Sequence, residues 1–312
     1  MGVIANLIQV PDTNRPDRVA YAGLIFATLL FSFTAVFIRL SEVGPAATGF
    51  WRFLITVPFM LLWIALASRR NQVRVLLANR REYLWMLFSA LMLTLNVLTW
   101  QSAVLMTSIA NAVLISNLHP IVVAFGAYFL FRERITPVFI LGLILALVGT
   151  GLLVREGAGQ FGVVTLGDGL ALLGAIFFAL WVLCLKNQRG SYSTPVTMVW
   201  NMGLACPMIL LATVLLEDGV VFPQTSAGWG LLGGYAITVN VIGLSIYAFV
   251  TGRLPASISA TALLIVPVFS SSYGWILFDE ALSLAQGAAG LLILAGLFVA
   301  QRGQRPQKPS PR

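Results

Sequence analysis

The sequence predicts an all-α integral membrane protein with ten transmembrane helices, arranged as two inverted repeats of five helices each. Composition is the first observation behind this fold class. Hydrophobic residues make up 59% of the 312 residues and charged residues only 10%, with a mean hydropathy of +0.91, whereas soluble domains carry about 25% charged residues. The lengths of the apolar runs and the placement of Lys and Arg are the second and third observations.

The apolar residues form runs that are long enough to cross a bilayer as helices, which takes about 17 to 25 residues. A transmembrane β-barrel would instead show segments of about ten residues with alternating polarity. Several runs contain Pro or Gly, which bundled membrane helices tolerate. The ten predicted helices cover residues 20–38, 46–66, 83–103, 109–130, 136–154, 169–185, 196–216, 228–250, 256–277 and 283–300.

The positions of Lys and Arg predict how these helices are oriented. With the amino terminus in the cytoplasm, sixteen of the nineteen Lys and Arg residues fall on the cytoplasmic side, Arg39 and Arg155 fall outside, and Arg52 lies in the membrane. Such an excess of cytoplasmic Lys and Arg is the positive-inside rule. We therefore expect a protein of the bacterial inner (plasma) membrane with both termini in the cytoplasm, and the net charge of +8 calls for no nucleic acid partner.

The two halves of the chain resemble each other. At an offset of 147 residues, "HPIVVAFGAYFLFRE" lies over "VPVFSSSYGWILFDE", which matches Pro120 to Pro267 and Glu133 to Glu280. At an offset of 149, "WRFLITVP" lies over "WNMGLACP". The predicted organisation is a cytoplasmic N-terminal segment, a first repeat, an external linker, a second repeat and a basic cytoplasmic tail, at residues 1–19, 20–154, 155–168, 169–300 and 301–312.

Because five is an odd number, the two halves must enter the membrane from opposite sides. The charges agree, since "RER" at 132–134 falls on the cytoplasmic side and its counterpart "DEA" at 279–281 falls outside. Two inverted repeats in one chain are typical of alternating-access transporters, in which the substrate lies near the midplane between the repeats. The pattern therefore predicts a transporter.

Several motifs also carry a family resemblance. The first predicted helix holds "FSFTAVFIRL" and the second "WRFL", and the two Pro-containing segments end in acidic residues and lead to "GAAGLLILAG". In these features, over residues 20–300, the chain resembles the drug/metabolite transporter superfamily of the EamA type. The resemblance implies a ten-helix carrier, in a superfamily that handles amino acids, nucleotide sugars, drugs and small metabolites. In overall similarity the chain looks most like the aromatic amino acid exporters of the YddG type.

Polar and aromatic residues at helical spacing predict a substrate-binding cavity, because polar groups that face lipid are costly. Trp100 and Tyr247 are related by the repeat and are expected to form two aromatic walls of this cavity. The alternative is that the Asn, Ser and Thr residues only hydrogen-bond neighbouring helices. The predicted substrate-binding residues are Asn96, Thr99, Trp100, Ser116, Asn117, His119, Trp181, Asn240, Tyr247, Ser257 and Thr261.

Three further residues are predicted to act in gating. Arg52 lies about six residues into its helix, at a depth of about 9 Å, so it can reach the outer interface. It is expected to be a gate or helix-packing cation at the outer mouth, with direct carboxylate binding as the alternative. Pro120 and Pro267 are expected to be kinks or hinges.

The sequence offers little for active coupling. His119 is the only histidine, and no Asp or Glu lies well inside a predicted span, although carboxylate relays are the usual mark of proton-driven pumps. Facilitated movement down a gradient is therefore expected, with a role of His119 in proton sensing as the alternative.

Together these features predict an exporter of small organic metabolites, above all amino acids and including aromatic ones. A carrier for another metabolite or drug is one alternative, and a channel is the alternative from another class. There is no phosphate-binding loop, no HExxH motif and no cluster of Cys and His, so no enzyme, cofactor or metal site is expected. The expected partners are a small-molecule substrate and the lipid bilayer, and the protein is expected to be a monomer.

Overall fold

The computed structural model describes residues 18–68, 77, 79–107, 112, 115–158, 166–217, 221–269, 272 and 283–303. Within these ranges the regular structure is entirely helical, which confirms the predicted all-α class for the described part of the chain. The helices are α2 (Arg18–Ser32), α3 (Thr34–Arg39), α4 (Pro45–Ser68), α5 (Arg80–Met106), α7 (His119–Phe131), α8 (Pro137–Ala158), α9 (Leu166–Arg189), α10 (Thr194–Leu216), α11 (Ser226–Tyr235), the π-helix η1 (Ala236–Leu244), α12 (Ser245–Arg253), α13 (Ala256–Ala262), the 3-10 helix η2 (Leu263–Ile265) and α15 (Leu284–Gly303).

The described helices are long and apolar enough to cross a membrane at seven places, and three shorter apolar helices accompany them. Each of these segments overlaps one of the runs predicted from the sequence. Their outward faces are apolar as well as their inward ones, as Leu215, Leu291 and Phe125 show by remaining 70%, 69% and 65% exposed. A helix that is apolar on all faces needs a lipid environment.

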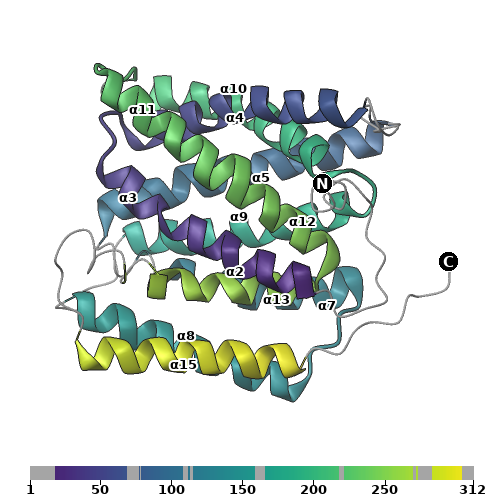
Figure 1. Ribbon diagram of the computed structural model, residues 1–312, viewed down its shortest axis with the longest axis vertical. Helices are drawn as coiled ribbons and strands as arrows, with labels where there is room; N and C mark the ends of the chain where they lie inside the picture. The colour runs from purple at the N-terminus through teal and green to yellow at the C-terminus, as the bar shows by residue number, and fades with distance from the viewer. Residues whose placement is uncertain are drawn as a thin grey trace.

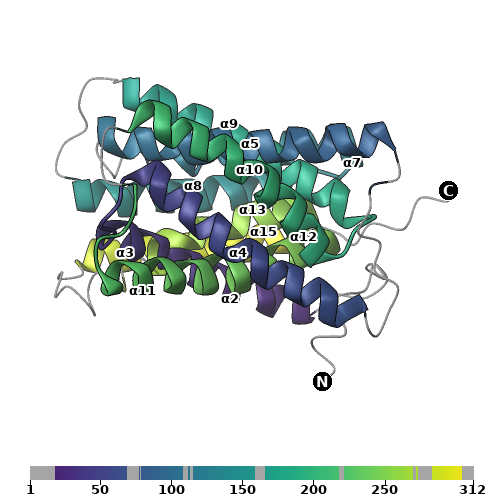
Figure 2. The same cartoon turned by 90° about the horizontal axis from the view of Figure 1, so that it is seen from above.

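The helices lie roughly side by side in one bundle (Figure 1), and the view from above shows that they form stacked layers (Figure 2). At one edge, α8 and α15 form a close pair, and at the opposite edge α4 packs with α10. The hydroxyl of Thr136, before α8, donates to the carbonyl of Gly303, the last residue of α15, at 2.7 Å. The two helices of this pair are therefore antiparallel.

Small residues allow α8 and α15 to approach closely. A Cβ atom on Gly149 of α8 would lie 3.0 Å from the carbonyl oxygen of Ala289, and a Cβ atom on Gly296 of α15 would lie 2.7 Å from that of Gly142. In the 147-residue register, Gly149 corresponds to Gly296 and Gly142 to Ala289. The same contact is thus made twice, once from each helix, as in an interface with two-fold symmetry.

We expect Gly296→Ala to destabilise the protein by roughly 1 to 3 kcal/mol, because the added methyl group forces the two backbones apart. The matched control is Gly287→Ala on the same helix, where a Cβ atom meets nothing within 4 Å. Thermal unfolding of both purified variants in detergent measures the difference. Equal melting temperatures for the two variants would show that the contact is not tight.

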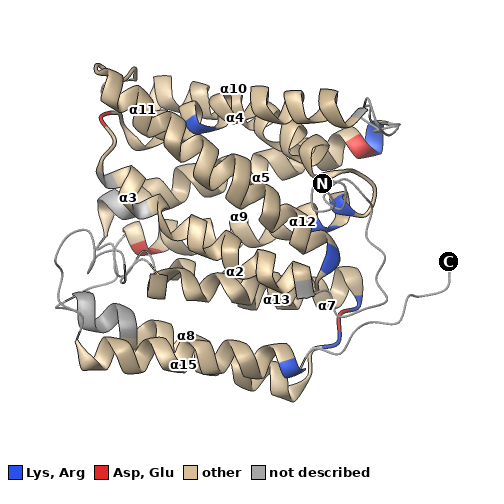
Figure 3. Cartoon of the chain, viewed as in Figure 1, with Lys and Arg blue, Asp and Glu red and all other residues tan. Residues whose placement is uncertain are grey.

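Charged residues gather at the two ends of the bundle (Figure 3). We call the end at which α5 and α8 begin and α9 and α15 end the basic end, and the opposite end the acidic end. Among the described side chains, the basic end holds Arg80, Arg81, Arg132, Arg134, Lys186, Arg189, Arg253 and Arg302, together with Glu82 and Glu133; the acidic end holds Glu42, Asp168 and Glu217. Helix α2 also begins at the basic end, where α15 ends.

Two carboxylates at the acidic end accept hydrogen bonds at the starts of helices, where backbone N–H groups lack partners. Glu217 accepts from the backbone N–H groups of Ala46 and Ala47 in α4, at 2.6 and 3.1 Å. Glu42 accepts from the hydroxyl and N–H of Thr225 and the N–H of Gln224, just before α11. These bonds, that from the Thr225 hydroxyl first, lower the pKa of Glu42.

Candidate substrate-binding site

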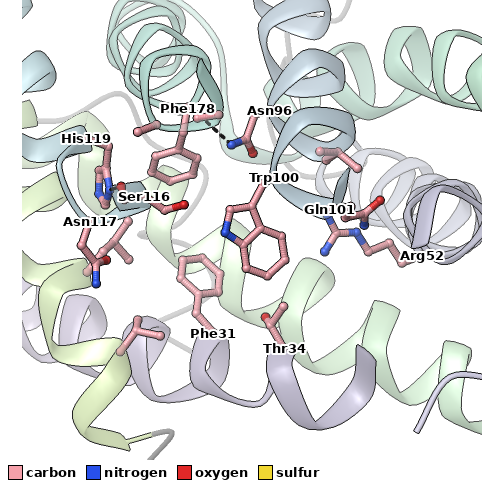
Figure 4. Close-up of a pocket in the computed structure, with 15 residues that line it drawn as sticks. Phe31, Thr34, Arg52, Asn96, Trp100, Gln101, Ser116, Asn117, His119 and Phe178 are labelled. Atoms are coloured by element: carbon pink, nitrogen blue, oxygen red, sulfur yellow. Dashed lines mark hydrogen bonds between the residues drawn. The ribbon is translucent and has the colours of Figure 1, made fainter. Parts of the chain in front are cut away.

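A cavity of about 240 Å³ lies inside the bundle, between its middle and the acidic end. Helices of both halves of the chain contribute to its wall. The lining residues are Phe31, Thr34, Arg52, Asn96, Val97, Trp100, Gln101, Ser116, Asn117, His119, Gly174, Ala175, Phe178, Leu263 and Val266. Ten of them are labelled in Figure 4.

Aromatic rings form the middle of the wall. Trp100 of α5 projects into the cavity between Phe31 of α2 and Phe178 of α9 (Figure 4). Behind these rings stand buried aromatic residues: the ring centroid of Phe178 lies 5.6 Å from that of Trp181, and that of Phe31 lies 5.6 Å from that of Tyr247. The rings are thereby held in place from outside, and they offer flat apolar surfaces to a ligand.

One polar end of the cavity lies at a break in a helix. Residues Asn117 and Leu118 form a turn immediately before α7. The break places Ser116, Asn117 and His119 at one side of the cavity (Figure 4). The Nδ1 atom of His119 lies 2.9 Å from the carbonyl oxygen of Ser116, and its ring packs edge-on against Phe178. Broken helices at membrane depth are tolerated where they line a cavity.

Arg52 and Gln101 form the other polar end (Figure 4). Arg52 lies in the second turn of α4, and one Nη atom of its guanidinium group donates to the hydroxyl of Tyr235. A Cβ atom placed on Gly49, one turn before Arg52, would lie 3.5 Å from Nε2 of Gln101 of α5. The two polar ends are separated by the aromatic rings of the wall, so the cavity is polar at both ends and apolar in between.

Several polar atoms of the wall are buried without a hydrogen-bond partner in the described structure. They are Nε of Arg52, Oε1 of Gln101, Oγ of Ser116, Nδ2 of Asn117 and Nε2 of His119. Buried polar groups are almost always satisfied in native proteins, and leaving one unpaired costs about 1 to 3 kcal/mol. Unpaired groups at both ends of one cavity are therefore groups that a polar ligand can satisfy.

The structure brings some of the predicted site residues together and separates others from the cavity. Asn96, Trp100, Ser116, Asn117, His119 and Arg52 line it. Outside the wall lie Thr99, Trp181, Asn240, Tyr247, Ser257, Thr261, Pro120 and Pro267.

The predicted residues outside the wall make structural contacts. Trp181 donates its indole N–H to Asn201 at 3.1 Å, and Asn240 donates to the carbonyl of Arg52 at 3.2 Å. Ser257 donates its hydroxyl to Glu133, and Thr261 donates its own to the carbonyl of Ser257. Thr99 donates to the carbonyl of Leu95 on its own helix at 2.6 Å, and Pro120 and Pro267 lie buried in helices.

Sequence reasoning missed several lining residues, above all Phe31, Thr34, Gln101 and Phe178. Gln101 could have been predicted, because it is a polar residue in an apolar run directly after Trp100, and such a residue tends to face the interior of the bundle. Phe31 and Thr34 lie in the family motif "FSFTAVFIRL", but the motif did not indicate that they line a cavity. Phe178 carried no signal, because Phe is common in a chain with twenty of them.

The fold and the cavity define a class of protein, the multi-pass membrane transporters, and comparisons with known proteins agree with this class. The model of the EamA-like transporter family matches residues 18–155 and 165–301. The chain belongs to this family. The predicted EamA resemblance is thereby confirmed, as is the general function of a transporter.

Curated relatives are distant but cover most of the chain. An uncharacterized transporter of Methanothermobacter thermautotrophicus is 23% identical over 89% of this chain and 85% of its own length. A probable amino-acid metabolite efflux pump of Salmonella typhimurium is 26% identical over 59% of this chain and 64% of its own length. A crystal structure that is 21% identical aligns with a TM-score of 0.78, covering 91% of this chain and 96% of that one, and shows that the fold is shared.

Proposed function

We propose that this protein is an alternating-access exporter of small organic metabolites, above all amino acids and including aromatic ones. The observation that carries the proposal is the cavity itself, with aromatic rings between two polar ends. At about 240 Å³ it is smaller than the roughly 300 to 1,000 Å³ of pockets for drug-sized ligands. Its size favours a solute such as a single amino acid over a nucleotide sugar. The Salmonella relative named as a probable amino-acid metabolite efflux pump supports the same choice.

The architecture that we propose has ten transmembrane helices in two inverted five-helix repeats, at residues 20–154 and 169–300. The two ranges that match the family model begin 147 residues apart, the offset of the internal repeat. The antiparallel pair of α8 and α15 supports inversion, since these helices occupy equivalent places in the two repeats and make the same glycine contact twice. The linker and terminal segments lie largely outside the described residues.

The orientation that we propose places the basic end in the cytoplasm of a bacterial cell, with the protein as a monomer in the inner membrane. The gathering of described Lys and Arg at that end supports it through the positive-inside rule. The cavity would then lie nearer the external side. Towards the basic end, the path is filled by buried side chains, among them Trp181, Tyr247 and Arg189, which are at most 1% exposed. This arrangement fits an outward-facing state.

Counterflow in proteoliposomes tests the proposed function. We expect saturable exchange of labelled phenylalanine or another apolar amino acid for the unlabelled one, and little exchange of nucleotide sugars. Single-channel currents, or exchange of none of the amino acids in a full panel, would contradict the proposal.

The same vesicles, with and without a pH gradient, test whether transport is coupled to protons. Facilitated movement predicts that the substrate does not accumulate against its gradient. Proton-driven accumulation that is lost in His119→Ala would show coupling instead.

A further inference from the structure

Among the described residues that line the cavity, Arg52 alone carries a permanent charge. It lies within an apolar membrane helix, where an uncompensated charge is costly. Buried charges are normally paired with an opposite charge, because otherwise the lost hydration is not repaid. The partners of Arg52 therefore decide its role.

The described structure surrounds this guanidinium group with neutral partners. Its central carbon lies 4.9 Å from the ring centroid of Phe53 and 5.1 Å from that of Tyr235. The Tyr235 hydroxyl accepts from Nη1, while Nε is buried without a partner. No carboxylate of the described residues forms an ion pair with Arg52. Cation–π contacts contribute only about 0.5 to 2 kcal/mol each, and within the described part of the chain the positive charge has no counter-ion.

The free atoms of the guanidinium group lie on one edge. Nη1 is committed to Tyr235, which leaves Nε and Nη2, the edge that a carboxylate binds with two parallel hydrogen bonds. Gln101 lines the same end of the cavity (Figure 4). The geometry thus offers a place for one planar anionic group at this end.

The other half of the chain holds the backbone of Arg52 in position. Asn240, in the π-helix η1, donates to the carbonyl oxygen of Arg52 at 3.2 Å and to the hydroxyl of Thr56 at 3.3 Å. The Thr56 hydroxyl donates to the same carbonyl at 2.6 Å. π-Helical segments occur frequently at functional sites. Here the segment fixes α4 from the second repeat, so Asn240 is a positioning residue for Arg52.

We propose that Arg52 binds the carboxylate of the transported solute, so that the substrates are amphipathic carboxylic acids lying lengthwise in the cavity. The apolar body of the solute packs between Phe31, Trp100 and Phe178. The α-amino group of an amino acid lies beside its carboxylate at the Arg52 end, where Oε1 of Gln101 is a buried acceptor without a partner. A polar group at the far end of the solute, such as the hydroxyl of a tyrosine side chain, reaches Ser116. This inference rests on the proposed function and narrows it. It also assigns Arg52 to recognition, where the sequence alone favoured gating or helix packing.

The test compares an acid with its neutral amide. Binding of L-phenylalanine and L-phenylalaninamide to the full-length protein in detergent is measured by calorimetry. We expect the wild type to bind the amide at least about tenfold more weakly, which corresponds to about 1.4 kcal/mol. Arg52→Gln should weaken binding of the acid by a similar factor, so that the protein binds the acid and the amide with nearly equal affinity. The affinity of Arg52→Lys for the acid should lie between those of the wild type and Arg52→Gln.

The matched control is Arg302→Gln. Arg302 also stacks on an aromatic ring, with its guanidinium carbon 4.2 Å from the centroid of Phe298, but it lies on α15 outside the cavity. This variant should keep the wild-type ratio. Because the ratio is measured in the wild type as well, the test does not depend on one variant folding. Equal binding of acid and amide by the wild type, or an unchanged ratio in Arg52→Gln, would overturn the proposal.

The outcome can be separated from that of the proposed function. If proteoliposomes exchange no amino acid, amino acid export fails, and the comparison is made with 3-phenylpropionate and 3-phenylpropionamide, which lack the amino group. A preference for the acid that Arg52→Gln removes would still support carboxylate binding by Arg52. No binding of either acid to the wild type would reject it.

Discussion

Trp100→Ala is expected to lower the transport of aromatic amino acids at least about tenfold while leaving the protein folded. The indole ring projects into the cavity between Phe31 and Phe178 (Figure 4), and an aromatic pair contributes about 0.5 to 1.5 kcal/mol beyond the area that it buries. Removing the ring also leaves the cavity too wide for its ligand. The fold should persist, because alanine keeps the Cβ atom of Trp100, which is the part of this side chain that lies near Gly174 of α9.

The matched control is Trp85→Ala on the same helix. Trp85 is 37% exposed and contacts Phe88 at the outer surface of the bundle, so its removal should leave transport unchanged. Initial rates of counterflow over a range of substrate concentrations separate the effects. A raised KM for Trp100→Ala would indicate lost binding, and equal rates for the two variants would show that Trp100 is not part of the site.

Glu133→Ala is expected to destabilise the protein by roughly 3 kcal/mol. Glu133 is 2% exposed and accepts hydrogen bonds from the N–H of Ala256 at 2.7 Å and from the N–H and hydroxyl of Ser257 at 3.3 and 2.7 Å. Its charge also interacts with the ammonium group of Lys186. Without the Glu133 carboxylate, the buried donors of Ala256 and Ser257 have no acceptor, and the positive end of α13 loses a nearby negative charge.

Thermal unfolding in detergent measures this loss, with a melting temperature expected to fall by about 5 °C or more. Glu133→Gln keeps the size and one acceptor oxygen but loses the charge, so it should fall between the wild type and Glu133→Ala. Glu42→Ala is the control, because Glu42 also accepts bonds before a helix but lies exposed at the acidic end. If Glu133→Ala costs no more stability than Glu42→Ala, burial of the carboxylate is not what matters.

The cavity was predictable from the sequence only in part. Asn96 and Trp100 were found because a polar face on an apolar helix has to point inward, and both line the cavity. Trp181 and Tyr247 were expected in the same site, yet each stands one layer behind it, against Phe178 and Phe31. Helical periodicity indicates which face of a helix is inward, but it does not indicate which neighbour that face meets.

The role of Arg52 was also beyond what a sequence pattern could indicate. In the sequence it was an arginine near the outer end of a helix, and snorkelling to the interface explained it. In the structure it lines the cavity, and its backbone is anchored by Asn240, 188 residues away in the chain. A contact over that separation depends on how two halves of a bundle pack, so no local pattern in the sequence could indicate it.

Composition and the lengths of the apolar runs were sufficient for the membrane class, the helical fold and the positions of the helices, because a bilayer imposes span length and apolarity on every segment that crosses it. The family motifs were sufficient for the transporter family, whereas the inverted repeat stays a prediction. Packing alone decided which of the inward-facing residues share the cavity and which of them support its wall. The break at Asn117 comes just before Pro120, where the sequence predicted a kink or hinge. Helix rotation, in contrast, depends on contacts between distant segments, and a run of apolar residues carries no information about those partners.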